Sequence, residues 1–156
     1  MTEDFRRLIE KNANKIKRLA RNYSFGNENN DLEQEIFLQI WRSYSSFSGQ
    51  SSIDTWLYRI AINTAVSFQR KEIRDRKGVA NSEQVQTSLN ASDGLPADEI
   101  LSIFMRELSA IEVAILTMYV DGLSSLQMEE VLGVKANAIK VRISRLKDKY
   151  TQRFIE

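Results

Sequence analysis

Apolar side chains recur at every third or fourth position in several long segments of this 156-residue chain. The clearest example runs from Ile53 through Trp56, Ile60 and Ala61 to Phe68. Such spacing places apolar groups on one face of an α-helix, because one turn contains about 3.6 residues. No stretch alternates cleanly enough between apolar and polar residues to form a strand. We therefore predict an all-α fold.

The same periodicity divides the chain into seven expected helices. They cover residues 5–23, 32–44, 53–68, 100–108, 109–121, 124–132 and 139–150. The first should end near Gly26, and Asn30 or Asp31 should cap the second. Capping boxes of the form Ser-x-x-Glu/Gln begin at Ser109 and Ser124.

Glycines stand where two of these helices should stop, at Gly122 and Gly133. A helix, a short turn with Gly133 and a final basic helix together predict a helix-turn-helix.

The segment Gly78–Pro96 contains no aromatic residue and no helical period, and it is rich in Ser, Asn, Gln and Gly. This composition is typical of a flexible linker. We predict two small helical domains, residues 1–77 and 98–156, joined by a flexible acidic linker at residues 78–97.

The net charge of +1 conceals an uneven distribution. Residues 1–80 carry a net charge of +4, residues 81–96 of −2, residues 97–133 of −6, and residues 134–156 of +5. A strongly basic terminal helix beside an acidic segment favours a nucleic-acid partner.

The chain contains neither Cys nor His. Disulfides, thiolate metal sites and cysteine nucleophiles are therefore excluded, as are the most common zinc ligand and neutral-pH base. Apolar runs are too short for a membrane span or a signal peptide. We expect a cytoplasmic protein that is not an enzyme and holds no metal or cofactor.

The last helix has a polar face opposite its apolar stripe. If Ile139 and Leu146 face the core, Val141 and Arg145 point outward. This arrangement suits binding in the major groove of DNA, where Val141 could contact a thymine methyl group. The alternative is a solvated basic face. The candidate residues are Asn137, Lys140, Val141, Arg142, Ser144, Arg145 and Lys149.

The segment Thr55–Asn63 places Trp56, Tyr58, Arg59 and Asn63 on one expected helix, and further bases follow it. This mixture suits single-stranded nucleic acid, because bases stack on rings while cations neutralise phosphates. Trp56 is interpreted as a core residue. Tyr58, Arg59 and Asn63 are expected to lie off the buried stripe, which makes them the better candidates.

Three motifs in order resemble the extracytoplasmic-function sigma factors of bacterial RNA polymerase. Asp31–Trp41 resembles their core-binding helix, and Phe47-Ser48-Gly49 with Thr55–Asn63 resembles their promoter-melting segment. Val120–Ser124, Leu132-Gly133-Val134 and Ile139–Arg145 resemble their fourth-region helix-turn-helix.

The resemblance implies roles for particular residues. Those that would dock on the clamp coiled coil of the large polymerase subunit are Asp31, Gln34, Glu35, Leu38 and Trp41. Those that would bind the minus-ten element are Phe47, Ser48, Tyr58, Arg59, Asn63, Arg70, Lys71 and Arg74, and Asn63 would read a flipped base. The exposed face of the last helix would read the minus-thirty-five duplex.

The resemblance implies core RNA polymerase and promoter DNA as partners, an anti-sigma factor as a further partner, and a monomer when free. Five positions depart from the family: Glu129 replaces a small residue, Lys135 replaces a capping Ser, Ser67 stands where Asp or Asn is frequent in the melting helix, and Val141 and Ser144 differ from the commonest choices. The main alternative is a helix-turn-helix regulator that is not a sigma subunit. Neither this alternative nor a purely helical interaction protein accounts for all three motifs.

Overall fold

The computed structural model describes residues 2–23, 29–49, 51–77 and 96–155. Within them lie seven helices and no strand, so the predicted all-α fold is confirmed. The helices are α1 (Thr2–Tyr23), α2 (Asn29–Tyr44), α3 (Ile53–Lys77), α4 (Ala97–Arg106), α5 (Ala110–Val120), α6 (Ser125–Leu132) and α7 (Ala136–Phe154).

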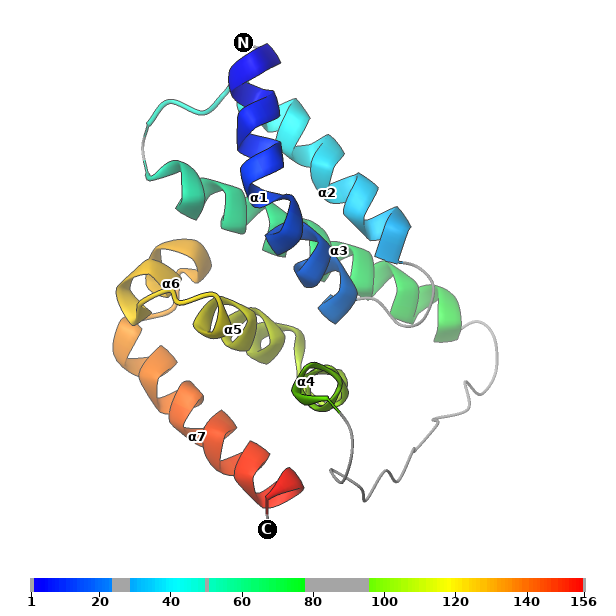
Figure 1. The fold of residues 1–156 in the computed structure, drawn as a ribbon, viewed down its shortest axis with the longest axis vertical. Coiled ribbons are helices and arrows are strands. Elements are labelled where there is room, and N and C mark those ends of the chain that lie inside the picture. Colours follow the sequence, from blue (N-terminus) through cyan, green and yellow to red (C-terminus); the bar gives the residue numbers. More distant parts are fainter. Residues whose placement is uncertain (1, 24–28, 50, 78–95, 156) are drawn as a thin grey trace.

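The first three helices pack against one another and form the upper part of the molecule in Figure 1. Each helix contributes an inward-facing apolar stripe, as the periodicity predicts. The buried residues include Ile16 and Leu19 of α1, Leu32, Ile36 and Ile40 of α2, and Leu57, Ala61 and Ala65 of α3. Burial of these stripes is what holds the three helices together.

Local capping determines where the helices of the second half begin and end. Both predicted capping boxes are present: the Ser109 and Ser124 side chains accept hydrogen bonds from the backbone N–H of Glu112 and Gln127. Gly133 ends α6 with φ of 74°, a left-handed conformation that costs glycine little. This turn directs the chain from α6 into α7.

Two of the residues that depart from the pattern of the resembled family, Lys135 and Glu129, lie near this turn. Lys135 precedes α7 and supplies no side-chain cap, as expected from the loss of a capping Ser. Glu129 is only partly buried, so its carboxylate can reach solvent.

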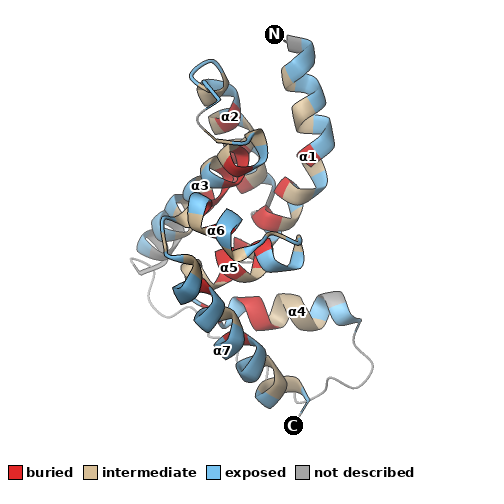
Figure 2. Ribbon diagram, turned by 90° about the vertical axis from the view of Figure 1, so that its left-hand side faces the viewer, coloured by how far each residue is buried: buried red, intermediate tan, exposed pale blue. Residues whose placement is uncertain are grey.

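The two halves of the chain are packed together. Helix α3 contacts α6, and α1 contacts α4 and α5. The buried apolar cluster includes residues of both halves, and Figure 2 shows buried segments of α1, α3 and α5 facing the interior. The predicted linker falls mostly on residues 78–95, which lie outside the described residues.

No helix in the described part of the chain has the length and apolar character needed to cross a membrane.

Replacing Ser109 with Ala should lower the free energy of unfolding by about 1 kcal/mol, because the change removes the α5 cap. Chemical denaturation checks this. The control is Ser67→Ala in the exposed interior of α3, where the higher helix propensity of Ala should leave stability unchanged or slightly increased. Equal losses in the two variants would contradict a capping role.

Candidate nucleic-acid interface

The outer face of α7 is open along its whole length. All seven candidate residues on this helix are exposed, including Val141 at 48%. Ile139 and Leu146, on the opposite side, are buried. The orientation inferred from periodicity is therefore confirmed, and the surface combines short polar groups, one aliphatic group and four cations.

Contacts at the far end of α7 fix the direction of this face. Tyr150 packs edge-on against Phe104 of α4, with 5.3 Å between ring centroids. The Arg153 guanidinium pairs with Glu107 at 3.3 Å, and the Lys147 ammonium lies 4.8 Å from the Tyr119 ring centroid. These contacts use the inner and lateral sides of α7 and leave the outer face open.

One face of α2 presents the five predicted polymerase contacts. At about 100° per residue, positions 31, 34, 35, 38 and 41 share an arc of about 120°. Leu38 is 39% exposed and Trp41 is 49% exposed, which is unusual for large apolar side chains beside acidic groups. The Trp41 ring rests edge-on against Phe5, 4.8 Å between centroids, and this contact limits its rotation.

Four predicted minus-ten residues share one exposed side of α3. Arg59, Asn63, Arg70 and Arg74 fall within an arc of about 60°, and all four are exposed. Lys71 is also exposed but lies further round the helix.

An aromatic pair adjoins this side of α3. The Phe47 ring lies 5.1 Å from that of Trp56, and both side chains are half-buried. Ser48 beside them is exposed. Phe47 and Ser48 thus lie near the start of α3, and Trp56 is more accessible than a core residue would be.

Tyr58 does not lie with the other candidates. It is only 4% exposed, and its hydroxyl donates a 2.6 Å hydrogen bond to Oδ2 of Asp121 in the second half. The prediction that placed Tyr58 off the buried stripe is wrong, because one residue step of about 100° turns it away from Arg59 and into the contact between the halves.

Burial and the contact with Asp121 both stabilise the protonated form of Tyr58. Burial, the hydrogen bond from its hydroxyl to Asp121 and the charge of that carboxylate all raise the pKa of the Tyr58 phenol above its ordinary value. The ammonium of Lys15 on α1 lies 5.7 Å from the centroid of the same ring. Tyr58 is therefore a neutral donor at physiological pH.

Glu130 at the end of α6 meets the start of α3. Its backbone carbonyl accepts a hydrogen bond from the Arg59 guanidinium. The buried Thr55 hydroxyl lies 3.3 Å from Oε2 of the Glu130 side chain and donates to it. Arg59 is thus exposed and at the same time bonded to the second half.

Helix α1 supplies the remaining polar contacts between the halves. The Arg18 guanidinium pairs with Asp121, whose side chain is only 3% exposed. The Asn22 amide donates to the Thr117 hydroxyl at 3.3 Å, and the Tyr23 hydroxyl donates to the Ala110 carbonyl at 2.6 Å. Burial raises the pKa of Tyr23, so its hydroxyl also stays protonated.

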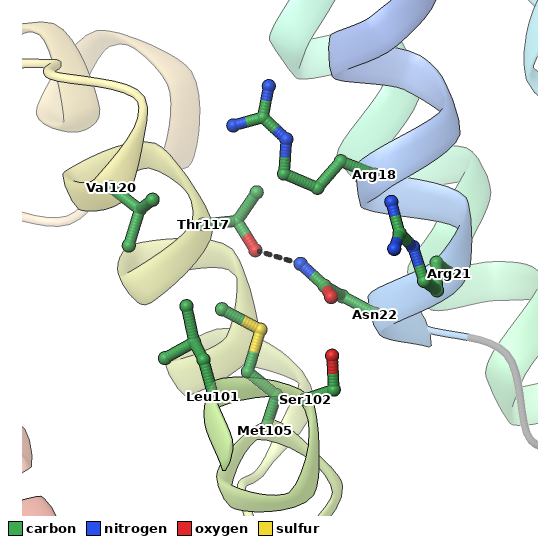
Figure 3. A pocket seen from close by; sticks show the side chains of 8 residues that line it. All are labelled: Arg18, Arg21, Asn22, Leu101, Ser102, Met105, Thr117 and Val120. Carbon is green, nitrogen blue, oxygen red and sulfur yellow. Dashed lines mark hydrogen bonds between the residues drawn. The ribbon is translucent and has the colours of Figure 1, made fainter. Parts of the chain in front are cut away.

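A pocket of about 300 Å³ lies beside these contacts, between α1, α4 and α5. Figure 3 shows Arg18, Arg21 and Asn22 on one side and Leu101, Met105 and Val120 on the other.

Sequence reasoning did not single out Arg18 or the contacts of Asp121. One feature of the sequence could have indicated that Asp121 has a cationic partner. Helix α5 has no basic residue in its last turn, yet Asp121 follows directly. A carboxylate there opposes the helix dipole, which predicts a cation from elsewhere in the chain.

Residues 8–75, which include most of α1 and α3 and all of α2, match the family model described as sigma-70 region 2. The chain is similar over 92% of its length to two curated proteins named ECF RNA polymerase sigma-E factor. The one from Haemophilus influenzae is 29% identical and is covered over 84% of its length. The one from Escherichia coli K12 is 26% identical and is covered over 83%.

Two solved structures share the arrangement of helices. The sigma factor RpoE of Bartonella quintana, in complex with the anti-sigma factor NepR, matches with a TM-score of 0.76 at 22% identity, over 96% of each chain. CnrH, in complex with the cytosolic domain of CnrY, matches with a TM-score of 0.71 at 18% identity, over 97% of this chain and 88% of CnrH.

The region 2 match, the similarity to sigma-E factors along nearly the whole chain and the shared fold all agree with the three sequence motifs. The chain therefore carries a sigma-70 region 2 segment and is similar over nearly its whole length to extracytoplasmic-function sigma factors.

Proposed function

We propose that this protein is an alternative sigma subunit that directs core RNA polymerase to specific promoters and initiates transcription. The observation that carries the proposal is the presence of a sigma-70 region 2 segment and a helix-turn-helix with an open reading face in one chain. A helix-turn-helix regulator that is not a sigma subunit has no need of a sigma-70 region 2 segment.

Residues 1–77 would form the region 2 domain, which binds polymerase and recognises and melts the minus-ten element. The exposed α2 face supports polymerase binding, because its apolar centre with acidic neighbours suits a basic, amphipathic partner helix. The exposed side of α3 supports strand binding, because Asn63 offers both a donor and an acceptor among three arginines.

Residues 98–156 would form the region 4 domain, which reads the minus-thirty-five duplex through α7. Arg145 and Ser144 would meet base edges, Val141 a thymine methyl, and the flanking cations the phosphates. The acidic segment at residues 78–97 would link the domains along the basic RNA-exit path of the polymerase.

The protein would work in the cytoplasm, where it contributes binding and positioning rather than chemistry. An anti-sigma factor is a further proposed partner. One solved structure that shares this fold holds the sigma factor RpoE with the anti-sigma factor NepR, and another holds CnrH with the cytosolic domain of CnrY.

Trp41→Ala should weaken binding to purified core polymerase at least tenfold, because it removes an exposed aromatic anchor from the α2 face. Leu38→Ala should act in the same direction. Val141→Ala, an equally exposed apolar position on α7, is the control and should bind core normally. Fluorescence anisotropy with labelled protein measures all three. The proposal fails if the unmodified chain does not bind core polymerase.

Arg145→Ala should weaken binding of holoenzyme to duplex minus-thirty-five DNA by about 1–3 kcal/mol. The matched control is Lys147→Ala, which removes the same charge from the same helix at a side chain that contacts Tyr119. Footprinting and a binding titration on a promoter found by transcript sequencing compare the two. An unchanged minus-thirty-five footprint in Arg145→Ala would rule out α7 as the reading helix.

Asn63→Ala should impair promoter melting more than core binding, because its amide is proposed to hold a flipped base. Permanganate reactivity of unpaired thymines reports melting, and anisotropy reports core binding. Asn14→Ala, the same change at an exposed position of α1 outside the proposed DNA contacts, is the control. Equal losses of melting and binding would instead show that Asn63 is structural.

A further inference from the structure

The pocket between α1, α4 and α5 takes no part in the contacts proposed for polymerase or DNA. Its volume is about 300 Å³, and the residues that line it lie outside the proposed binding faces of α2, α3 and α7. Small-molecule sites are often concave spaces of this size at the junction between two parts of a protein. The pocket therefore has both the position and the size of such a site.

Helix α1 forms a cationic wall of this pocket. The Arg18 guanidinium is paired with Asp121, whereas Arg21 makes no ion pair with any of the described residues. The residues that the structure describes around the pocket include no acidic side chain. The Asn22 amide donates one N–H to the Thr117 hydroxyl and has a second N–H that can donate to a ligand. This wall therefore combines an uncompensated positive charge with a hydrogen-bond donor.

The opposite wall is apolar and comes from the second half of the chain. Leu101 and Met105 of α4 and Val120 at the end of α5 lie across the pocket from α1 (Figure 3). Met105 is 3% exposed and lies at the bottom, whereas Val120 is 47% exposed and lies at the opening. Removing apolar surface from water against this wall is favourable, so the wall suits a hydrocarbon group better than a second charge.

The volume of the pocket limits the size of a ligand. An engineered cavity of about 150 Å³ holds one benzene molecule. This pocket is about twice as large, so it has room for one ring and a short chain that ends in an acid group. A carboxylate matches a guanidinium, because its two oxygens can accept two parallel N–H bonds. A nucleotide would leave the apolar wall without a matching group.

We propose that this pocket binds a small amphipathic carboxylate. The acid group pairs with Arg21 and Asn22, and the hydrocarbon group lies against Leu101, Met105 and Val120. The ligand contacts helices of both halves, so its binding stabilises the folded chain by mass action. This inference is independent of the proposed function, because its residues belong to none of the surfaces assigned to polymerase or DNA.

An NMR titration of the full, ¹⁵N-labelled chain tests the site directly. The probe is 4-phenylbutyrate, in which a short chain joins a benzene ring to a carboxylate. Its dissociation constant should be about 2 mM or lower, the affinity that about twelve ligand atoms typically supply. The largest changes in chemical shift should occur at the backbone amides of pocket residues, such as Asn22, Leu101 and Thr117.

Two further probes separate the contributions of the two walls. The amide 4-phenylbutanamide keeps the ring and loses the charge, whereas acetate keeps the charge and loses the ring. Each should bind at least about tenfold more weakly than 4-phenylbutyrate, because each lacks the group that one wall recognises.

Arg21→Gln should raise the dissociation constant of 4-phenylbutyrate about tenfold or more, because it removes the unpaired cation. The matched control is Arg7→Gln, which removes the same charge from an exposed position of the same helix outside the pocket. Val120→Ser should also weaken binding. Its control is Leu126→Ser, at an exposed apolar position of α6 that does not line the pocket. Both controls should bind the probe normally.

The site is refuted if 4-phenylbutyrate gives no saturable shift in pocket residues up to about 20 mM, or if the neutral amide binds as tightly. Equal weakening by Arg21→Gln and Arg7→Gln would also refute it, because overall charge would then explain the binding. Should Arg21→Gln lose the native spectrum, the comparison of Val120→Ser with Leu126→Ser decides. Binding to core polymerase tests the sigma assignment separately, so the two failures are distinguishable.

Discussion

One buried carboxylate joins the two halves of this protein at the point where three of its helices meet. Asp121 follows the C-terminal turn of α5, where the helix dipole disfavours negative charge. It is stabilised there because Arg18 of α1 and Tyr58 of α3 both donate to it. These two donors join three helices from both halves at one point. The buried apolar cluster shared by both halves and the hydrogen bonds from Asn22 and Tyr23 add to this pairing.

The surfaces proposed for function are those that this packing leaves open. The α2 face with Leu38 and Trp41 and the outer face of α7 are exposed although the halves are closed. The exposed side of α3 is only partly available for binding, because Asn63 is exposed whereas Arg59 is hydrogen-bonded to Glu130. The closed chain therefore offers polymerase and duplex contacts more readily than single-strand contacts.

The existence of the helices and the limits of α5 and α6 were predictable because their signals are local. A capping box such as Ser109-x-x-Glu112 acts within one turn, and Gly133 is needed where φ becomes positive. The outward direction of Val141 and Arg145 followed from the position of Ile139 on the same helix. Tyr58 was misplaced because its surroundings come from residues more than 60 positions away, which no local period reveals.

The sequence by itself determined the all-α fold, the helix-turn-helix, the identity of the family motifs and the open face of α7. Each depends on helical periodicity or on caps within a few residues, and both are encoded in short segments. Only the tertiary structure decided that the two halves close on each other, that Asp121 pairs with Arg18 and Tyr58, and that Arg59 reaches Glu130. These contacts join residues distant in sequence, and their free energy depends on burial, which exists only once the helices have packed.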